Sequence, residues 1–179
     1  MLTSLSRRLR TAETFELAIA TILEDVVALL GAEYGNIQLP VEDDLVIVAQ
    51  RGLNEAFLKT FKRVKKDDGS ACGRALRLRK SVMINDVEKD AEFATFLADA
   101  RAAGFRAVQS TPLFTSDDLL LGIVSTHFAN VHELTPIEFR TLQVYSIVAA
   151  EHAFQLLGNR SLATKAKEMN DALYAPVQQ

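Results

Sequence analysis

Apolar residues recur at helical spacing in two long segments, one near each end of the chain. From about Thr11 to Leu30 they line one face of a helix, which Thr11 can cap and Gly31 can end. Residues 135–138 read Thr-Pro-Ile-Glu, a capping box with proline at the first helical position. They open a second helix that lasts to about Leu157. The pattern therefore predicts a helix at each end of one domain.

Two pairs of shorter segments between these helices alternate polar and apolar residues, as half-buried strands do. Residues 34–39 and 45–50 predict a first hairpin, and residues 105–114 and 119–128 predict a second. Residues 81–84 predict one further, brief strand. Most of the predicted strands thus belong to two antiparallel hairpins.

Short helices are predicted between the hairpins, over residues 54–61 and 70–78, with the charged residues 64–69 as a loop. Asp90 can cap another helix, which Gly104 ends. The resulting order is α–β–β–α–α–β–α–β–β–α. This order predicts an α+β fold, in which an antiparallel sheet carries helices on both of its faces.

The composition argues against several classes of function. A net charge of −3 disfavours a dedicated nucleic-acid-binding protein, which carries a basic face. Cys72 is the only cysteine, which excludes an internal disulfide and a cysteine-based zinc cluster and makes a reducing cytoplasm the expected location. The histidines at 127, 132 and 152 are too scattered to suggest a metal site, and no glycine-rich phosphate loop occurs. No apolar run has the length of a membrane span, and no catalytic apparatus is recognisable, so an enzyme is not predicted.

Four stretches of the sequence are distinctive together: residues 67–76 (DDGSACGRAL), 84–93 (INDVEKDAEF), 103–113 (AGFRAVQSTPL) and 120–128 (LLGIVSTHF). In this order they resemble the GAF domain, and in particular a bacterial subgroup that is attached to sensor histidine kinases and other signalling proteins. The resemblance extends over roughly residues 12–157.

The resemblance implies a fold and a division of the chain. In such domains the two terminal helices pack on one face of the sheet, and short helices and loops cover the other face, where the ligand pocket lies. The domain would cover residues 11–158, between an N-terminal extension at 1–10 and a C-terminal tail at 159–179. This tail, helical or flexible, could extend the last helix as far as Tyr174. Members of the family bind cyclic nucleotides, bilins, haem or small metabolites, and some bind nothing known, so the cofactor stays open.

Candidate pocket residues lie on the strands of the second hairpin. Alternation places Arg106, Val108 and Ser110 on one face of their strand, and Ser125 and His127 on one face of theirs. The resemblance to bilin-binding phytochromes implies that Arg106, Ser110, Ser125 and His127 line the pocket. Arg106 would then grip a carboxylate or phosphate, and His127 would donate to a carbonyl or ligate a haem iron. Val108 replaces a serine of the bilin pattern and weakens the case for that chromophore. A structural, hydrogen-bonded histidine and an exposed or ion-paired arginine are the alternatives.

Two amide side chains are candidates on the first strand. Asn36 and Gln38 lie on the face opposite to Ile37 and Leu39. If the apolar pair faces the long helices, the amides face the pocket and need a polar ligand or ordered water. A half-exposed edge strand is the alternative.

Cys72 stands near the start of the short helix over residues 70–78, where the helix dipole could lower the pKa of its thiol. A redox sensor or a covalent chromophore site would need such a thiol. The backbone at Ser70 could also offer N–H groups to an anion. However, Gly73 follows Cys72 where bilin-linking cysteines of related photoreceptors are followed by histidine, and a GAF-type methionine sulfoxide reductase needs further cysteines. A packed, inert thiol is the alternative.

The last predicted helix is apolar over more of its circumference than one contact with a sheet requires. With the resemblance, this predicts a homodimer through the terminal helices. The sequence thus predicts a regulatory module of bacterial signal transduction, as in two-component systems, that senses a small polar or anionic molecule and acts on a partner protein. A dimerisation or interaction module with a degenerate pocket and a redox sensor at Cys72 are the alternatives.

Overall fold

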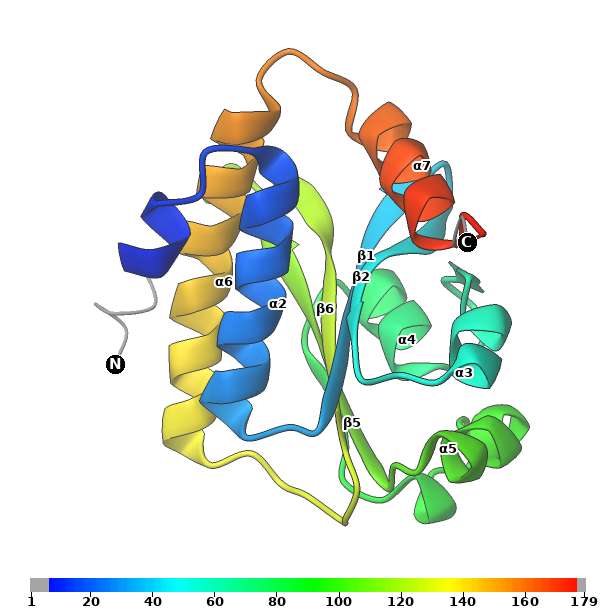
Figure 1. Ribbon diagram of the computed structural model, residues 1–179. Coiled ribbons are helices and arrows are strands. Elements are labelled where there is room, and N and C mark those ends of the chain that lie inside the picture. Colours follow the sequence, from blue (N-terminus) through cyan, green and yellow to red (C-terminus); the bar gives the residue numbers. More distant parts are fainter. Residues whose placement is uncertain (1–6, 177–179) are drawn as a thin grey trace.

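A six-stranded antiparallel sheet separates two layers of helices in the computed structural model, which describes residues 7–176 (Figure 1). Neighbouring strands follow the order β3-β2-β1-β6-β5-β4 across the sheet. The two central strands are therefore β1 and β6, one from each predicted hairpin. The strands are β1 (Tyr34–Val41), β2 (Asp44–Arg51), β3 (Arg63–Lys65), β4 (Val82–Ile84), β5 (Ala107–Phe114) and β6 (Leu120–Phe128).

The two long helices cover one face of this sheet and the short helices cover the other, as predicted (Figure 1). On the first face lie α2 (Phe15–Leu30) and α6 (Pro136–Leu157). The second face is covered by α3 (Glu55–Thr60), α4 (Ala71–Leu78), α5 (Leu97–Ala103) and the 3₁₀ turns η1 (Val87–Lys89) and η2 (Ala94–Phe96). The α+β fold class is thereby confirmed.

Strand alternation divides the buried residues into two cores, one on each face of the sheet. Ile37 and Leu39 pack with α2 and α6, whereas Leu45 and Ile47 pack with the short helices. The two central strands approach each other closely at Gly122, where a Cβ atom would collide with the Gln38 carbonyl oxygen. Glycine at this position therefore keeps β6 against β1.

Local sequence signals set the ends of the long helices. The capping box at the start of α6 is confirmed: the Glu138 N–H donates to Thr135 Oγ1 at 3.2 Å, and the Thr135 N–H donates to Glu138 Oε2 at 2.8 Å. The prediction that Thr11 caps α2 was wrong. Residues 7–10 form a helical turn of their own, and Thr11 donates its hydroxyl back to the Arg8 carbonyl. Thr14 caps α2 instead.

Two further expectations on the short-helix face need correction. The predicted loop over residues 64–69 contains part of β3, because Val64 is buried and pairs with the start of β2. Asp90 does not begin a long helix. Its carboxylate accepts the Phe93 N–H at 3.0 Å, two short turns follow, and α5 begins only at residue 97. Gly104, at φ +81°, ends α5 as expected.

The C-terminal tail does not extend α6. Gly158, at φ +60°, stops that helix, and the chain turns back into a separate helix, α7 (Leu162–Leu173), which lies against the β1–β2 hairpin (Figure 1). The Asn170 side-chain amide donates to the Ile47 carbonyl at 2.6 Å, just beyond the residues of β2 that pair with β3. Lys165 forms an ion pair with Glu16 of α2. The tail is thus a packed element of the fold.

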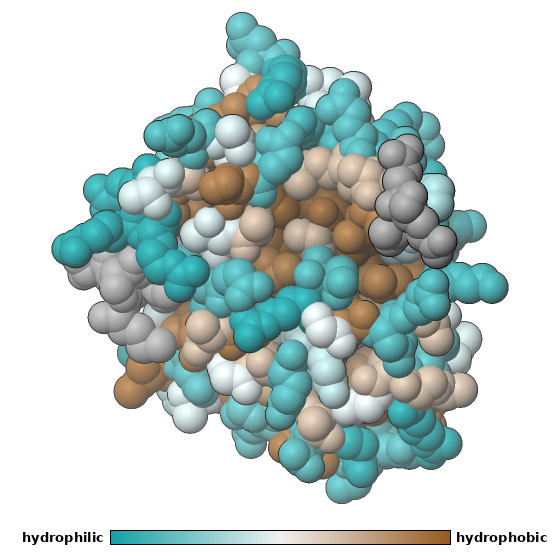
Figure 2. All heavy atoms as spheres, viewed as in Figure 1, coloured by the Kyte–Doolittle hydropathy of each residue, from teal (hydrophilic) through white to brown (hydrophobic). Residues whose placement is uncertain are grey.

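Apolar residues gather at the centre of the face seen in Figure 2, over the β1–β2 hairpin between α2 and α7, and hydrophilic residues surround them. The helix α7 borders this apolar area on one side. No helix in residues 7–176 has the length and apolar character needed to cross a membrane.

Candidate functional site

A cavity lies between the sheet and the short helices, and its lining residues are all buried. About 20 Å³ is open to the centre of a water molecule, which is room for about one or two waters. Residues of β1, β5 and β6 form its floor, and α3, α4 and the segments around positions 93 and 105 cover it. The lining residues are Asn36, Gln38, Phe57, Phe61, Ser70, Ala71, Cys72, Phe93, Phe105, Val108, Ser110, Ser125 and His127.

A row of polar side chains crosses the floor of this cavity. Asn36 of β1 lies directly opposite Ser125 of β6, and Ser125 lies directly opposite Ser110 of β5. The two serine hydroxyl oxygens are 2.7 Å apart and form a hydrogen bond. Because each strand alternates, the apolar neighbours Ile37 and Val124 point to the long helices. Of the two alternatives for β1, this is the arrangement that turns its amides to the pocket.

Four polar side-chain atoms at the cavity have no hydrogen-bond partner within residues 7–176: Asn36 Oδ1, both Gln38 amide atoms and His127 Nδ1. The three side chains come from the two central strands and are almost completely buried. Buried polar groups in proteins are nearly always hydrogen-bonded. These atoms therefore mark the cavity as a place where a polar molecule is accommodated.

His127 is surrounded by aromatic rings. The ring centroids of Phe105 and Phe57 lie 4.7 Å and 5.2 Å from that of the imidazole, in edge-to-face arrangements. Burial lowers the pKa of His127 to about 3. The imidazole is therefore neutral at physiological pH, with one nitrogen that donates a hydrogen bond and one that accepts.

Arg106 does not reach the cavity, and the prediction that it lines the pocket was wrong. Its guanidinium forms an ion pair with Asp86, with Nη2 2.8 Å and Nε 3.2 Å from Oδ1, and 43% of its side chain is exposed. This contact holds the pKa of Asp86 below its usual range. The strand β5 begins only at Ala107, so the alternation that applies to Val108 does not extend to Arg106.

Cys72 is a buried thiol, and the expectation that the helix dipole lowers its pKa was wrong. Burial raises the pKa of Cys72 to about 11, so desolvation outweighs the dipole. The thiol lies 3.3 Å from the Ser70 hydroxyl. At neutral pH it is protonated and therefore a poor nucleophile.

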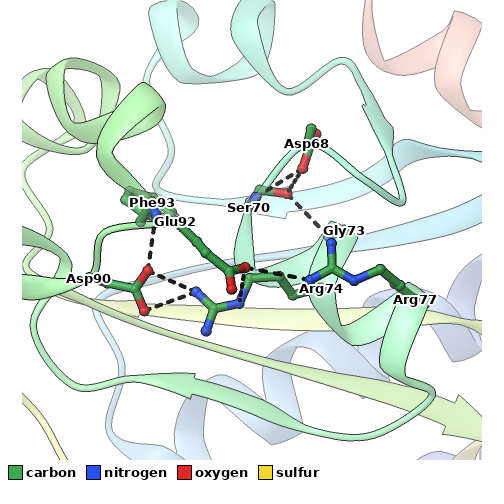
Figure 3. A network of polar contacts seen from close by, with 8 residues as sticks. All are labelled: Asp68, Ser70, Gly73, Arg74, Arg77, Asp90, Glu92 and Phe93. Carbon is green, nitrogen blue, oxygen red and sulfur yellow. Dashed lines mark hydrogen bonds and ion pairs between the residues drawn. The ribbon is translucent and has the colours of Figure 1, made fainter.

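The start of α4 holds its own anionic partner, as Figure 3 shows. The Asp68 carboxylate accepts the Ser70 N–H at 2.9 Å and the Ser70 hydroxyl at 2.6 Å, and Ser70 Oγ accepts the Gly73 N–H at 3.1 Å. The sequence suggests a binding site for an anion at the backbone of Ser70. Because Asp68 occupies this site, a second anion would be repelled there.

Ion pairs join α4 to the segment that carries Phe93, one of the cavity walls (Figure 3). Arg74 Nη1 lies 2.9 Å from both oxygens of Asp90, and Asp90 also accepts the Phe93 N–H. Glu92 contacts Arg74 at 3.5 Å and Arg77 at 3.4 Å. This network positions Phe93 against the cavity.

The structure brings seven of the eight predicted site residues to one cavity: Asn36, Gln38, Ser70, Cys72, Ser110, Ser125 and His127. Sequence reasoning missed the aromatic cover formed by Phe57, Phe61, Phe93 and Phe105. Phe57 and Phe61 were detectable as an apolar pair four positions apart on a short helix. Phe93 and Phe105 gave no comparable signal, because they come from irregular segments.

The residues present do not fit a tetrapyrrole such as a bilin or haem. The space at the cavity is that of one or two waters, far below the several hundred Å³ (about 300–1,000) of usual ligand sites. Val108 stands where the bilin pattern has a serine, and Gly73 follows Cys72. Within residues 7–176, no three or more His, Cys, Asp and Glu side chains are grouped so that they could hold a metal ion.

Comparisons with known proteins agree on the fold. A sequence model of the GAF domain matches residues 12–150. The GAF domain of an Acinetobacter phosphoenolpyruvate-protein phosphotransferase superposes with a TM-score of 0.70 and 11% identity, over 86% of this chain and 90% of that one. The free methionine-R-sulfoxide reductase of Neisseria meningitidis gives 0.69 and 15%, over 92% and 89%.

The chromophore-binding domain of a bacteriophytochrome from R. palustris gives a TM-score of 0.66 and 17% identity, over 87% of this chain and 60% of that one. No curated protein matches the chain. At these identities the solved structures show the fold alone.

Proposed function

The chain belongs to the GAF domain family of small-molecule-sensing signalling modules, and we propose that it is a regulatory module that binds a small molecule in the cavity above β1 and β6. The observation that carries this proposal is the group of unpartnered buried atoms on Asn36, Gln38 and His127. Unsatisfied groups of this kind cost stability, about 1–3 kcal/mol each. A ligand that bonds to them would recover that cost.

The sheet offers a path from the cavity to the long helices. Asn36 faces the cavity, and its neighbour Ile37 packs into the core under α2 and α6. The same holds for Ser125 and Val124 on β6. A ligand that shifts these central strands would therefore move residues on which the long helices rest.

We propose that two copies of the chain pair through α6. This helix buries Leu142, Tyr145, Ala149 and Ala153 against the sheet and α2 but leaves a second set of apolar residues exposed, namely Ile137 (74%), Val144 (52%), Ile147 (46%) and Val148 (39%). Exposed apolar residues in a row along one helix are typical of a protein–protein interface.

Sedimentation velocity tests this pairing. The native chain is expected to sediment as a dimer, and Ile147→Glu is expected to give a monomer, because the substitution places a charge in the apolar row. Thr164→Glu, which introduces the same charge at an exposed position of α7, is the control and keeps the dimer. A native chain that sediments only as a 19.7 kDa species at micromolar concentration would contradict the pairing.

The signalling context is part of the proposal. The four distinctive stretches resemble GAF domains attached to bacterial sensor kinases, and in that context α6 or α7 would contact an output protein. We propose no catalytic role, because the single cysteine is protonated at neutral pH and buried. The small volume of the cavity favours a second candidate, an interaction module whose pocket has degenerated.

Thermal unfolding in the presence of nucleotides, metabolites, haem and bilins separates these two candidates. A sensing module is stabilised saturably by at least one compound, whereas an interaction module responds to none. Val108→Ile adds a methylene group at the cavity wall and is expected to abolish the response. Val131→Ile makes the same change at an exposed position between β6 and α6 and is expected to keep it.

A further inference from the structure

The cavity provides no charge to a ligand. All of its lining side chains are uncharged at neutral pH, because burial keeps the His127 imidazole neutral and the Cys72 thiol protonated. The charged groups that contact its lining residues are carboxylates: Asp68 accepts from Ser70, and Asp90 accepts the Phe93 N–H. An anion would lose its hydration in this cavity without gaining a counter-charge, and the desolvation of an unpaired charge has a large unfavourable free energy.

Gln38 defines the geometry that a ligand must match. Both atoms of its carboxamide, the acceptor Oε1 and the donor Nε2, are buried without a partner in the part of the chain that the structure describes. An amide that offers an acceptor and a donor side by side satisfies both at once, as glutamine does when it pairs with the edge of a nucleobase. Asn36 Oδ1 lies two positions away on the same strand, and His127 Nδ1 lies further along the cavity floor, where His127 pairs with Tyr34.

The opposite side of the cavity is apolar. Phe57, Phe61, Phe93 and Phe105 cover the amide groups, and several of their rings contact one another, as the 4.4 Å stacking of Phe57 and Phe61 shows. The space as it stands holds one or two waters. A larger molecule that enters when the cover moves would meet amide groups on one side and aromatic rings on the other. That environment suits a compact molecule with an apolar body and one polar edge.

We propose that the ligand is a small uncharged molecule with an amide-type edge, such as an amide, a lactam or a nucleobase-like ring, held by the Gln38 carboxamide. This inference rests on the proposed function, because it assigns a chemical class to the molecule sensed at the same cavity. It also replaces the anionic ligand that Arg106 suggested, since that arginine pairs with Asp86 instead.

Entry of such a molecule requires the cover to move. The helix α3 carries Phe57 and ends at its C-cap residue Phe61. It is tied on its outer side by the Tyr174 hydroxyl, which donates to the Leu58 carbonyl at 2.7 Å. The Asn54 side chain ties the start of α3 to the Ala102 carbonyl at 2.9 Å. A shift of this short helix opens the cavity while the sheet stays in place.

Titrations of the full chain with matched probes test the proposal. 2-Pyridone, benzamide and acetamide are the neutral probes, and benzoate and acetate are the charged counterparts of the last two. Binding is followed by NMR at the His127 ring, which lines the cavity. The neutral probes are expected to give saturable shifts, and each carboxylate is expected to bind at least about ten-fold more weakly than its amide.

Variants of Gln38 show whether its carboxamide holds the probe. Gln38→Met removes donor and acceptor at similar size, and the affinity for 2-pyridone is expected to fall about ten-fold or more. Gln38→Leu, a second apolar variant, carries the same expectation if the first fails to fold. Gln155→Met is the matched control on the surface of α6 and keeps the native affinity.

The outcomes separate this inference from the proposed function. Carboxylates that shift the His127 ring as effectively as the amides, or a Gln38 variant with native affinity, would overturn the amide assignment and leave ligand binding in place. The same holds if no probe binds while another compound saturates the cavity. If neither the probes nor the wider set of compounds bind, both proposals fail.

Discussion

The hydroxyl groups of Ser110 and Ser125 bond to each other across β5 and β6, with their oxygens 2.7 Å apart. The two residues lie at the floor of the cavity, yet their hydroxyl groups already have a hydrogen-bond partner within the protein. The buried polar atoms without a hydrogen-bond partner belong to the side chains of Asn36, Gln38 and His127. This difference separates residues that shape the cavity from residues that are available to a ligand.

The serine pair gives a double-mutant prediction. Ser125→Ala removes one hydroxyl and leaves that of Ser110 buried without its partner, so the free energy of unfolding is expected to fall by about 1–2 kcal/mol. Ser110→Ala should cost a similar amount. The double variant should cost clearly less than the sum, because it removes both partners. Urea unfolding measures all three values, and strictly additive costs would count against the bond.

His127 predicts a dependence of stability on pH. Its pKa falls from 6.5 to about 3 on folding, so between these values the unfolded chain binds a proton that the folded chain does not. This contribution to the free energy of unfolding is complete above pH 6.5 and is lost as the pH falls, by up to about 1.4 kcal/mol per pH unit. The difference in unfolding free energy between the native chain and His127→Gln should follow this slope. A difference that stays flat from pH 7 to pH 4 (roughly the accessible part of the window) would contradict the burial of a neutral imidazole.

Cys72 should react slowly with thiol reagents in the folded protein. Its pKa is about 11 against an ordinary 9.0, which reduces the thiolate fraction about 100-fold at pH 8, and burial hinders access further. Because it is the only cysteine, labelling reports on this residue alone. The same chain unfolded in urea is the control and should react at the rate of a free thiol. Equal rates in the two states would show that the thiol is accessible and would revive the redox alternative.

Asn170 tests whether the C-terminal helix belongs to the fold. Asn170→Ala leaves the Ile47 carbonyl at the sheet edge without this donor, so the free energy of unfolding should fall by about 1–3 kcal/mol. Asn159→Ala, in the exposed turn before α7, is the matched control and should change stability little. Urea denaturation of both variants decides the question. Equal stability of the two would mean that α7 is only loosely attached.

The sheet and the long helices were predictable because their signals are local. Alternation alone places Asn36 and Gln38 on the face away from Ile37 and Leu39, and the structure has them so. The capping box at Thr135 likewise depends on residues three positions apart. Such features follow from period and spacing, without knowledge of what the segment contacts.

The remaining features depend on contacts between distant segments. Arg106 turns away from the cavity because the turn at 86–89 brings a carboxylate beside it, twenty positions earlier in the chain. The direction of α7 after Gly158 depends on where the edge of β2 lies, and the tail sequence alone does not reveal it. For the same reason, the pKa of the Cys72 thiol is determined by its burial and not by its place on a helix.

The most direct test of ligand sensing is the NMR spectrum of the two histidine rings at positions 127 and 152, recorded with a panel of small uncharged metabolites at constant pH. His127 lines the cavity and His152 lies on α6, so the second ring reports whether the effect of a ligand reaches the long helices. At least one compound should shift the His127 resonances saturably and lose its effect in Val108→Ile. If no compound moves His127, or if a compound that stabilises the protein shifts only surface residues, the cavity is not the sensing site.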